Sequence, residues 1–401
     1  MAPSASSITD TSKSWRRLLV ALTIAIVTNI GIWAFVVIMP SIEAEFGTPR
    51  SQTAFPYTMT MIGFGIGNVL LGRVLDKFGI TRALIGGSSL IGFSFFAAAS
   101  SHDIYFLAAV HFCLGIGTSV GFGPLIADVS HWFSRNRGIA VAIIASGNYL
   151  SGVVWPVFIS DMLADNTWRD VYLLLGIMVP SLTIPLSFAM NDRLVVANAS
   201  PSNELAKQRT TTKHLSGQNL QWLLGMAGIC CCVAMSMPQV HMVSYCVGLG
   251  YGPAIGAELL SIMLAFGVMS RLIFGLVSDK LGGIRTVLIS SFLQMLSLWF
   301  FLPFDSPISL YIVSAIFGLA QGGIVPSYAI VVREFLPATE AGERIGLVLM
   351  MTVFGMALGG WMSGAVFDLT GSYQLAFLNG VLWNLFNLVI MGWLLIRTRN
   401  L

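Results

Sequence analysis

The chain has 401 residues, of which 56% are hydrophobic and 10% are charged, and its formal net charge is +3. A soluble globular domain carries about 25% charged residues, so this composition excludes a soluble enzyme and places most of the chain in lipid. The net charge is small, and we expect no nucleic acid among the partners.

The polar N-terminal segment ends in a basic pair, Arg16 and Arg17. An apolar run of about 20 residues or more follows this pair, without a small-residue cleavage site. The pattern predicts a first membrane span rather than a signal peptide that is removed.

Further apolar segments follow along the whole chain. A bilayer core of about 30 Å requires about 20 apolar residues in each spanning helix, and twelve segments meet that requirement. They are residues 17–40, 54–75, 80–100, 104–127, 137–160, 170–190, 220–247, 254–279, 284–303, 308–332, 344–367 and 373–397. Their glycines and prolines are tolerated in membrane helices.

A long polar stretch at 191–218 divides these spans into six and six. We therefore expect an all-α membrane protein with twelve transmembrane helices in two pseudo-symmetric six-helix bundles, at 17–190 and 219–397. Residues 1–16 form a cytoplasmic tail, 191–218 a cytoplasmic linker that is partly disordered, and 398–401 a cytoplasmic C-terminus.

Basic residues gather in alternate loops. One face holds 18 of the 21 Lys and Arg residues, whereas the other holds only Arg50 and Arg169. The positive-inside rule makes the basic face cytoplasmic, so both termini are expected there, as an even number of spans requires. We expect a multi-pass protein of the plasma membrane, which is the inner membrane in a cell that also has an outer one.

A charged turn occurs twice. "GRVLDKFGITR" spans Gly72–Arg82, and "GLVSDKLGGIR" follows 203 residues later at Gly275–Arg285. A second pair of similar segments, "GPLIADVSHWF" and "VPSYAIVVREF", ends the fourth and tenth spans. Two parallel six-helix repeats are an arrangement of secondary transporters, which bind substrate near the middle of the membrane between the halves.

The doubled turn, the twelve spans and the long central loop resemble the major facilitator superfamily over the whole chain. In that superfamily the turn latches the two halves together on the cytoplasmic side. The resemblance implies that Asp76 pairs with Arg137 or with the start of the eleventh span. Asp128, at the cytoplasmic end of the fourth span, can join this latch. The alternative is that the turn only anchors the topology. The residues to which the resemblance gives a gating role are Gly72, Asp76, Lys77, Arg82, Arg137, Asp279, Lys280 and Arg285.

Residues 123–156, from the end of the fourth span through the fifth, read "GPLIADVSHWFSRNRGIAVAIIASGNYLSGVVWP". This stretch resembles the monocarboxylate transporter and oxalate–formate antiporter branches. In the monocarboxylate family an arginine in the eighth span binds the substrate carboxylate, and Arg271 matches it. A guanidinium can hold a carboxylate by two parallel hydrogen bonds. The alternative is an arginine that snorkels to the headgroups. The chain departs from the family at Gly267, where an acidic residue is common, and residues 345–367 hold no second cation.

Other polar and aromatic residues within the spans are candidates for the walls of the substrate pathway. His241 can titrate near neutral pH, or it can be a neutral histidine bonded to a neighbouring helix. The aromatic residues can equally be packing residues. With Arg271, the candidate substrate-binding residues are Asn29, Trp33, Asn148, His241, Gln321 and Tyr328.

The sequence contains no phosphate-binding loop, no HExxH and no GxSxG, so we expect neither an enzyme nor a cofactor. The five cysteines lack the spacing of a zinc site. We therefore expect a monomeric secondary transporter, a symporter or exchanger, that moves a small monocarboxylate by alternating access. Protons or a second anion would be coupled to it. The alternative is a facilitator that exports amphipathic or drug-like compounds.

Overall fold

The computed structural model describes residues 9–192, 217–336 and 341–398. Most of the expected linker and tails therefore lies outside the described residues. Within the described part of the chain, twelve helical spans are long and apolar enough to cross a membrane, and these confirm the predicted all-α fold. The first span begins at Ser12, five residues before its expected start, because Thr11 and Ser14 form a capping box there.

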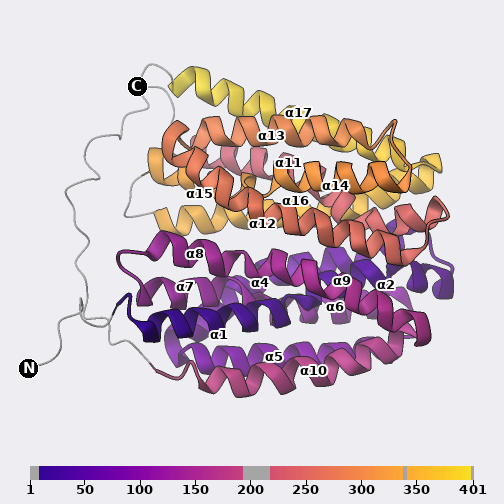
Figure 1. The fold of residues 1–401 in the computed structure, drawn as a ribbon, viewed down its shortest axis with the longest axis horizontal. Helices are drawn as coiled ribbons and strands as arrows, with labels where there is room; N and C mark the ends of the chain where they lie inside the picture. Colours follow the sequence, from indigo (N-terminus) through magenta and orange to yellow (C-terminus); the bar gives the residue numbers. More distant parts are fainter. Residues whose placement is uncertain (1–8, 193–216, 337–340, 399–401) are drawn as a thin grey trace, which may run out of the picture. The chain divides into compact units, whose positions relative to one another are not determined.

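The chain divides into two compact units, and each is described by itself. Unit 1 comprises Met1–Thr48 and Phe55–Ala199, and unit 2 comprises Pro49–Ala54 and Ser200–Leu401. The short segment Pro49–Ala54, which connects the first two spans, thus belongs to unit 2 although it lies early in the sequence. Figure 1 traces both units.

The helices of unit 1 are α1 (Ser12–Thr28), α2 (Ile30–Phe46), α4 (Phe55–Phe78), α5 (Ile80–Ala99), α6 (Ile104–Thr118), α7 (Gly123–Trp132), α8 (Arg137–Ala145), α9 (Gly147–Asp165) and α10 (Trp168–Phe188), with the 3-10 turn η2 (Ser119–Gly121). The helices of unit 2 are α3 (Arg50–Thr53), α11 (Gly217–Gly248), α12 (Pro253–Leu281), α13 (Gly283–Phe300), α14 (Pro307–Gln321), α15 (Ile324–Phe335), α16 (Ala341–Thr370) and α17 (Tyr373–Thr398).

The repeated charged turn has the same backbone conformation in both units. Gly79 joins α4 to α5 with φ +88° and ψ 166°, and Gly282 joins α12 to α13 with φ +79° and ψ 165°. Only glycine adopts this conformation without strain. The turn therefore requires glycine at both positions, for the same physical reason.

A second structural repeat lies where helices cross closely. A Cβ added at Gly115 in α6 would lie 2.1 Å from the carbonyl oxygen of Thr60 in α4. A Cβ added at Gly318 in α14, 203 positions later, would lie 2.1 Å from the carbonyl oxygen of Met263 in α12. Both glycines allow two backbones to touch, as small residues do in membrane helix pairs.

The fourth and tenth spans are interrupted at corresponding places. The fourth is broken into α6, η2 and α7, and the tenth changes from α14 to α15 at Gly322 and Gly323. The first span is also broken, at Asn29, and the fifth at Ser146. Interrupted helices expose backbone polar groups at membrane depth, so such breaks indicate where a polar pathway can run.

Candidate functional site

The break in the first span contacts the break in the fourth. Asn29, which is fully buried, donates from Nδ2 to the carbonyl oxygens of Ala25 (2.8 Å) and Gly121 (3.2 Å). Its Oδ1 is buried and has no hydrogen-bond partner among the described residues. Asn29 therefore satisfies a carbonyl at the break of the fourth span and retains one acceptor inside unit 1.

Two other candidates of unit 1 are bonded to each other. The indole Nε1 of Trp33 donates to the backbone oxygen of Asn148 (2.9 Å) and to its side-chain Oδ1 (3.1 Å). Trp33 is buried, whereas Asn148 is half-buried at the start of α9. The pair joins α2 to α9 through a specific polar contact.

In unit 2, Gln321 ends α14 at the break of the tenth span. Its Oε1 accepts a 2.8 Å hydrogen bond from Nε2 of Gln239 in α11. Both side chains are buried, and Nε2 of Gln321 has no partner in the described part of the chain. The break of the tenth span, like that of the first, thus holds a buried amide with unused hydrogen-bonding capacity.

His241 has both ring nitrogens bonded within unit 2. One nitrogen, Nε2, lies 2.8 Å from the carbonyl oxygen of Gly360, and Nδ1 lies 3.1 Å from the hydroxyl of Tyr373. A carbonyl only accepts, so Nε2 carries the proton and a neutral Nδ1 accepts from Tyr373. This arrangement matches the alternative of a histidine bonded to neighbouring helices.

Arg271 lies inside α12, ten residues before its end at Leu281, or about 15 Å along the helix. It is half-buried and follows Ser270, whose hydroxyl donates to the carbonyl oxygen of Leu319 (2.7 Å). A Cβ added at Gly322 would lie 2.2 Å from the carbonyl oxygen of Gly267. These contacts place Arg271 at the level of the break in the tenth span.

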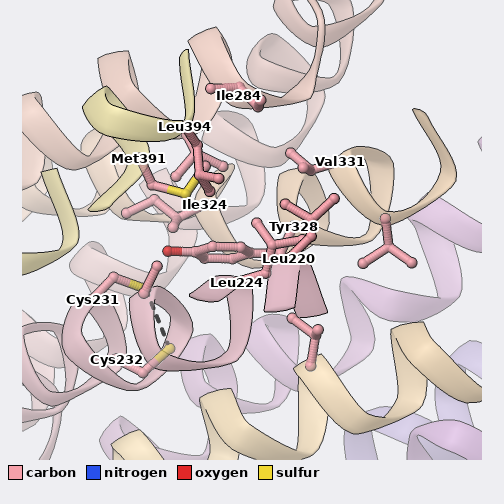
Figure 2. Close-up of a cluster of buried hydrophobic side chains, with 14 of the residues drawn as sticks. Leu220, Leu224, Cys231, Cys232, Ile284, Ile324, Tyr328, Val331, Met391 and Leu394 are labelled. Atoms are coloured by element: carbon pink, nitrogen blue, oxygen red, sulfur yellow. Dashed lines mark hydrogen bonds between the residues drawn. The ribbon is translucent and has the colours of Figure 1, made fainter. Parts of the chain in front are cut away.

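Tyr328 lies in a buried hydrophobic cluster of unit 2. Its ring lies among Leu220, Leu224 and Met391, as Figure 2 shows. The hydroxyl donates to Oδ1 of Asn387 in α17 (2.8 Å). The structure thus gives Tyr328 packing and hydrogen-bonding contacts between helices of unit 2.

Within the described residues of unit 1, the structure shows no ion pair between Asp76 and Arg137, one of the two partners that the resemblance implies for Asp76. Asp76 and Arg137 are both exposed, and Arg137 donates to the hydroxyl of Ser130 in α7 (3.3 Å). Arg137 begins α8, and its side chain turns back on the preceding helix instead of reaching α4. The other expected partner of Asp76, the start of the eleventh span, belongs to unit 2 and stays a prediction.

Asp128 does not join that latch either. Its two carboxylate oxygens accept hydrogen bonds from Nε and Nη2 of Arg17, each at 2.8 Å. Arg17 also donates to the carbonyl oxygen of Met190 (3.0 Å), and its guanidinium lies 4.5 Å from the ring centre of Trp132. The half-buried carboxylate of Asp128 accepts both hydrogen bonds from Arg17 of α1, and this pair ties α1 to α7.

The other gating candidates lie at the two repeated turns. Lys77 and Arg82 are exposed on either side of Phe78, and Lys280 and Asp279 are exposed at the end of α12. The remaining candidates at these turns are Gly72, which is half-buried in α4, and Arg285, which is exposed in α13. The structure describes their positions, and their gating role stays a prediction.

Three polar contacts were missed from the sequence. Asp368 in α16 accepts from the backbone N–H groups of Arg50 and Ser51, each at 2.8 Å. Glu334 in α15 accepts from the backbone N–H of Gly283 at the start of α13. The only signal for either acid was a carboxylate near the end of an apolar span.

The third missed contact is at Asp10, before α1. Its carboxylate accepts from the backbone N–H groups of Ser134, Arg135 and Asn136, at 2.9–3.0 Å. The hydrogen bonds from Arg135 and Ser134 hold the pKa of Asp10 well below its ordinary value of 3.8. The hydrogen bond from Lys13 likewise lowers the pKa of Asp192. Both contacts lie at the end of unit 1 where α1 begins.

Among the described residues, no group of three or more His, Cys, Asp or Glu side chains is placed to hold a metal ion. The five cysteines are free thiols. Each unit thus has a buried amide with unused hydrogen-bonding capacity at a helix break, and unit 2 also has Arg271 at the depth of the break in the tenth span.

The sequence matches the family model described as Major Facilitator Superfamily over residues 21–308 and 259–400. It is 24% identical to the MFS-type transporter pynF of Aspergillus niger over 80% of this chain and 73% of that protein. It is also 24% identical to monocarboxylate transporter 13 of Bos taurus over 86% of this chain and 80% of that protein. A solved structure of a mutant of the nucleoside transporter NupG superposes with a TM-score of 0.72, at 16% identity, over 95% of this chain and 100% of that one.

Proposed function

The chain belongs to the Major Facilitator Superfamily and is a multi-pass membrane transporter, and we propose that it moves a small monocarboxylate by alternating access. Arg271 would hold the carboxylate. The candidates Asn29, Trp33, Asn148, His241 and Gln321 would shape the pathway or support its walls, and the turns at 72–82 and 275–285 would set the conformational balance.

The position of Arg271 carries this proposal. A charged side chain near the centre of a membrane helix costs about 2.5–3.5 kcal/mol on insertion scales, so such residues face polar cavities or partners. Arg271 is about 15 Å from the end of α12, at the level where the tenth span is broken. A guanidinium at that depth suits the planar carboxylate of a substrate, which it can bind through two hydrogen bonds.

A single charge on the substrate fits the distribution of cations. Residues 345–367 of the eleventh span contain no Lys or Arg, and Arg344 at its start donates to Oε1 of Gln221 (2.6 Å). A single half-buried cation, Arg271, neutralises a monoanion but leaves a dianion with excess charge in a medium of low dielectric. The similarity to a protein named monocarboxylate transporter 13 agrees with this substrate class.

Exchange of two anions is the form of coupling that we favour. Gly267 occupies the place where related transporters have an acidic residue, and both nitrogens of His241 are bonded inside unit 2. Neither residue is suited to carry a proton beside Arg271. The proposed orientation places the basic loops and both termini in the cytoplasm of a cell whose plasma membrane holds the protein.

The test is uptake of a panel of small acids into proteoliposomes by the wild type, Arg271→Lys and Arg271→Ala. Lysine retains the charge but loses the bidentate geometry, so uptake should fall about tenfold or more. Arg333→Lys, an exposed cation at the end of α15, is the matched control and should transport normally. Full uptake by both Arg271 variants would remove Arg271 from the site.

The second candidate function is export of amphipathic compounds. The uncharged polar groups of unit 1 favour it, because Oδ1 of Asn29 is an acceptor without a hydrogen-bond partner among the described residues. It predicts that amphipathic cations or neutral compounds raise the melting temperature of the wild type, and that they raise the melting temperature of Arg271→Ala by a similar amount. A ligand at 100 times its Kd adds about 2.7 kcal/mol of stability, so a thermal-shift screen of the wild type and Arg271→Ala separates the two functions.

A further inference from the structure

A cavity of about 640 Å³ opens in unit 1 where α4 ends, α5 begins and α10 ends. Its apolar walls include Phe78, Ile85 and Phe188, and its polar lining includes Thr81, Arg82 and Asn191. Phe78 and Phe188 are 40% and 60% exposed. The cavity therefore has an apolar side formed by partly exposed rings and a polar side with a cation.

The cavity lies at the basic end of unit 1. Thr81 donates to the carbonyl oxygen of Ser187, which ties the start of α5 to the end of α10. Lys77 and Arg73 precede it on α4, and both are exposed. In the orientation proposed above, this end lies at the headgroups of the cytoplasmic leaflet, where anionic lipids attract basic side chains.

The polar side also contains the start of α5. Gly79 provides no side chain to cap this 20-residue helix, and the hydroxyl of Thr81 is engaged with Ser187. The first N–H groups of α5 and the positive end of its dipole therefore face the same region as Arg82. Together they favour a negatively charged group.

The second repeat shows what an anion does at this position. In unit 2 the carboxylate of Glu334 occupies the start of α13, and both of its oxygens lie 3.1 Å from the backbone nitrogen of Gly283. In the paired segments 123–133 and 325–335, the position of Glu334 corresponds to Trp132, which is not an acid. Unit 1 thus keeps the glycine turn and the arginine of the repeat, but α7 supplies no carboxylate at the corresponding position.

We propose that this cavity binds the headgroup of an anionic phospholipid. The phosphate would lie against Arg82 and the N–H groups of α5, and the glycerol and upper acyl chains would lie along Phe78, Ile85 and Phe188. The volume of the cavity exceeds that of a phosphate ion, and its apolar half matches a lipid rather than a free anion. The bound lipid would perform in unit 1 the capping that Glu334 performs in unit 2.

The experiment measures binding of phosphatidylglycerol and of phosphatidylcholine to the purified protein by native mass spectrometry. The wild type should prefer phosphatidylglycerol, and Arg82→Gln should bind it about fivefold more weakly. The matched control is Arg285→Gln, the corresponding arginine of unit 2, where Glu334 already fills the start of the helix. It should retain the wild-type preference.

A second variant, Asn191→Asp, adds a carboxylate to the cavity without removing the arginine. It should weaken the binding of phosphatidylglycerol to about the same extent as Arg82→Gln does. The proposal is overturned by equal binding of both lipids to the wild type, or by equal losses in Arg82→Gln and Arg285→Gln. Displacement of the lipid by an equal concentration of inorganic phosphate would also overturn it, in favour of a small-anion site. Lipid binding is measured without transport, so its failure is distinct from failure of the proposed function.

Discussion

Asp368 accepts a 2.8 Å hydrogen bond from the backbone N–H of Arg50, although 318 positions separate them in the sequence. The neighbouring N–H of Ser51 donates to the second carboxylate oxygen. The guanidinium of Arg50 lies 3.7 Å from the ring centre of Phe367, and Gly364 allows the backbone of Arg50 to approach α16. This contact is why the segment Pro49–Ala54 belongs to unit 2.

Asp368→Ala should lower the melting temperature, because it removes two hydrogen bonds to a charged acceptor. Hydrogen bonds of this exposed kind contribute about 1 kcal/mol each, so we expect a loss of about 1–2 kcal/mol. Asp305→Ala, which removes an exposed carboxylate between α13 and α14, is the control and should unfold like the wild type. Equal melting temperatures for the two variants would show that the contact contributes no stability.

Replacing Gly115 or Gly318 by alanine should destabilise the protein, each by about 1–3 kcal/mol, because the new Cβ would overlap a backbone carbonyl at 2.1 Å. Gly86→Ala, in α5, is the matched control, since a Cβ there meets nothing within 4 Å. Alanine at Gly86 should be neutral or stabilising by up to about 1 kcal/mol. Unfolding in detergent measures all three, and tolerance of both crossing-point variants would contradict the close contact.

Asp128→Asn should lower the free energy of unfolding by about 3–5 kcal/mol, because it leaves the buried charge of Arg17 without its carboxylate partner. The side chains of Arg17 and Asp128 are only 4% and 12% exposed. Asp192→Asn is the control, since it breaks the Lys13–Asp192 pair, which is exposed to solvent and therefore contributes little to stability. Similar melting temperatures for Asp128→Asn and Asp192→Asn would refute the buried pair.

Asp10 should make the protein sensitive to acid. Its folded-state pKa is lowered by hydrogen bonds from Arg135 and Ser134, so its stabilising effect is fully present above the unfolded-state pKa near 3.8. That effect is lost as the pH falls from there through the lowered folded-state pKa. Asp10→Asn keeps a residue that tolerates the positive φ of this position but removes the charge.

The melting temperatures of wild type and Asp10→Asn should therefore differ at neutral pH and converge in strong acid. Thermal unfolding at a series of pH values from about 7 downward, past 3.8, checks this. A difference that stays constant throughout would mean that the asparagine side chain alters packing and that the carboxylate charge contributes nothing.

The twelve spans, the doubled turn and the superfamily could be predicted from the sequence because each depends on chemistry within one segment. A run of about 20 apolar residues must be helical in lipid, and positive φ at Gly79 and Gly282 requires glycine whatever packs nearby. The depth of Arg271 followed from counting residues along its helix.

The hydrogen-bond partners of the Asp and Glu side chains could not be predicted from the sequence in the same way. Asp76 and Asp128 both lie near the basic end of unit 1, yet Asp76 is exposed and Asp128 is bonded to Arg17, 111 positions away. Which cation an acid meets depends on which helices become neighbours and how each is rotated. Hydropathy places a residue at a depth in the membrane, and only the packing of helices decides what faces it there, as for Glu334 at the start of α13 and Asp368 beside Arg50.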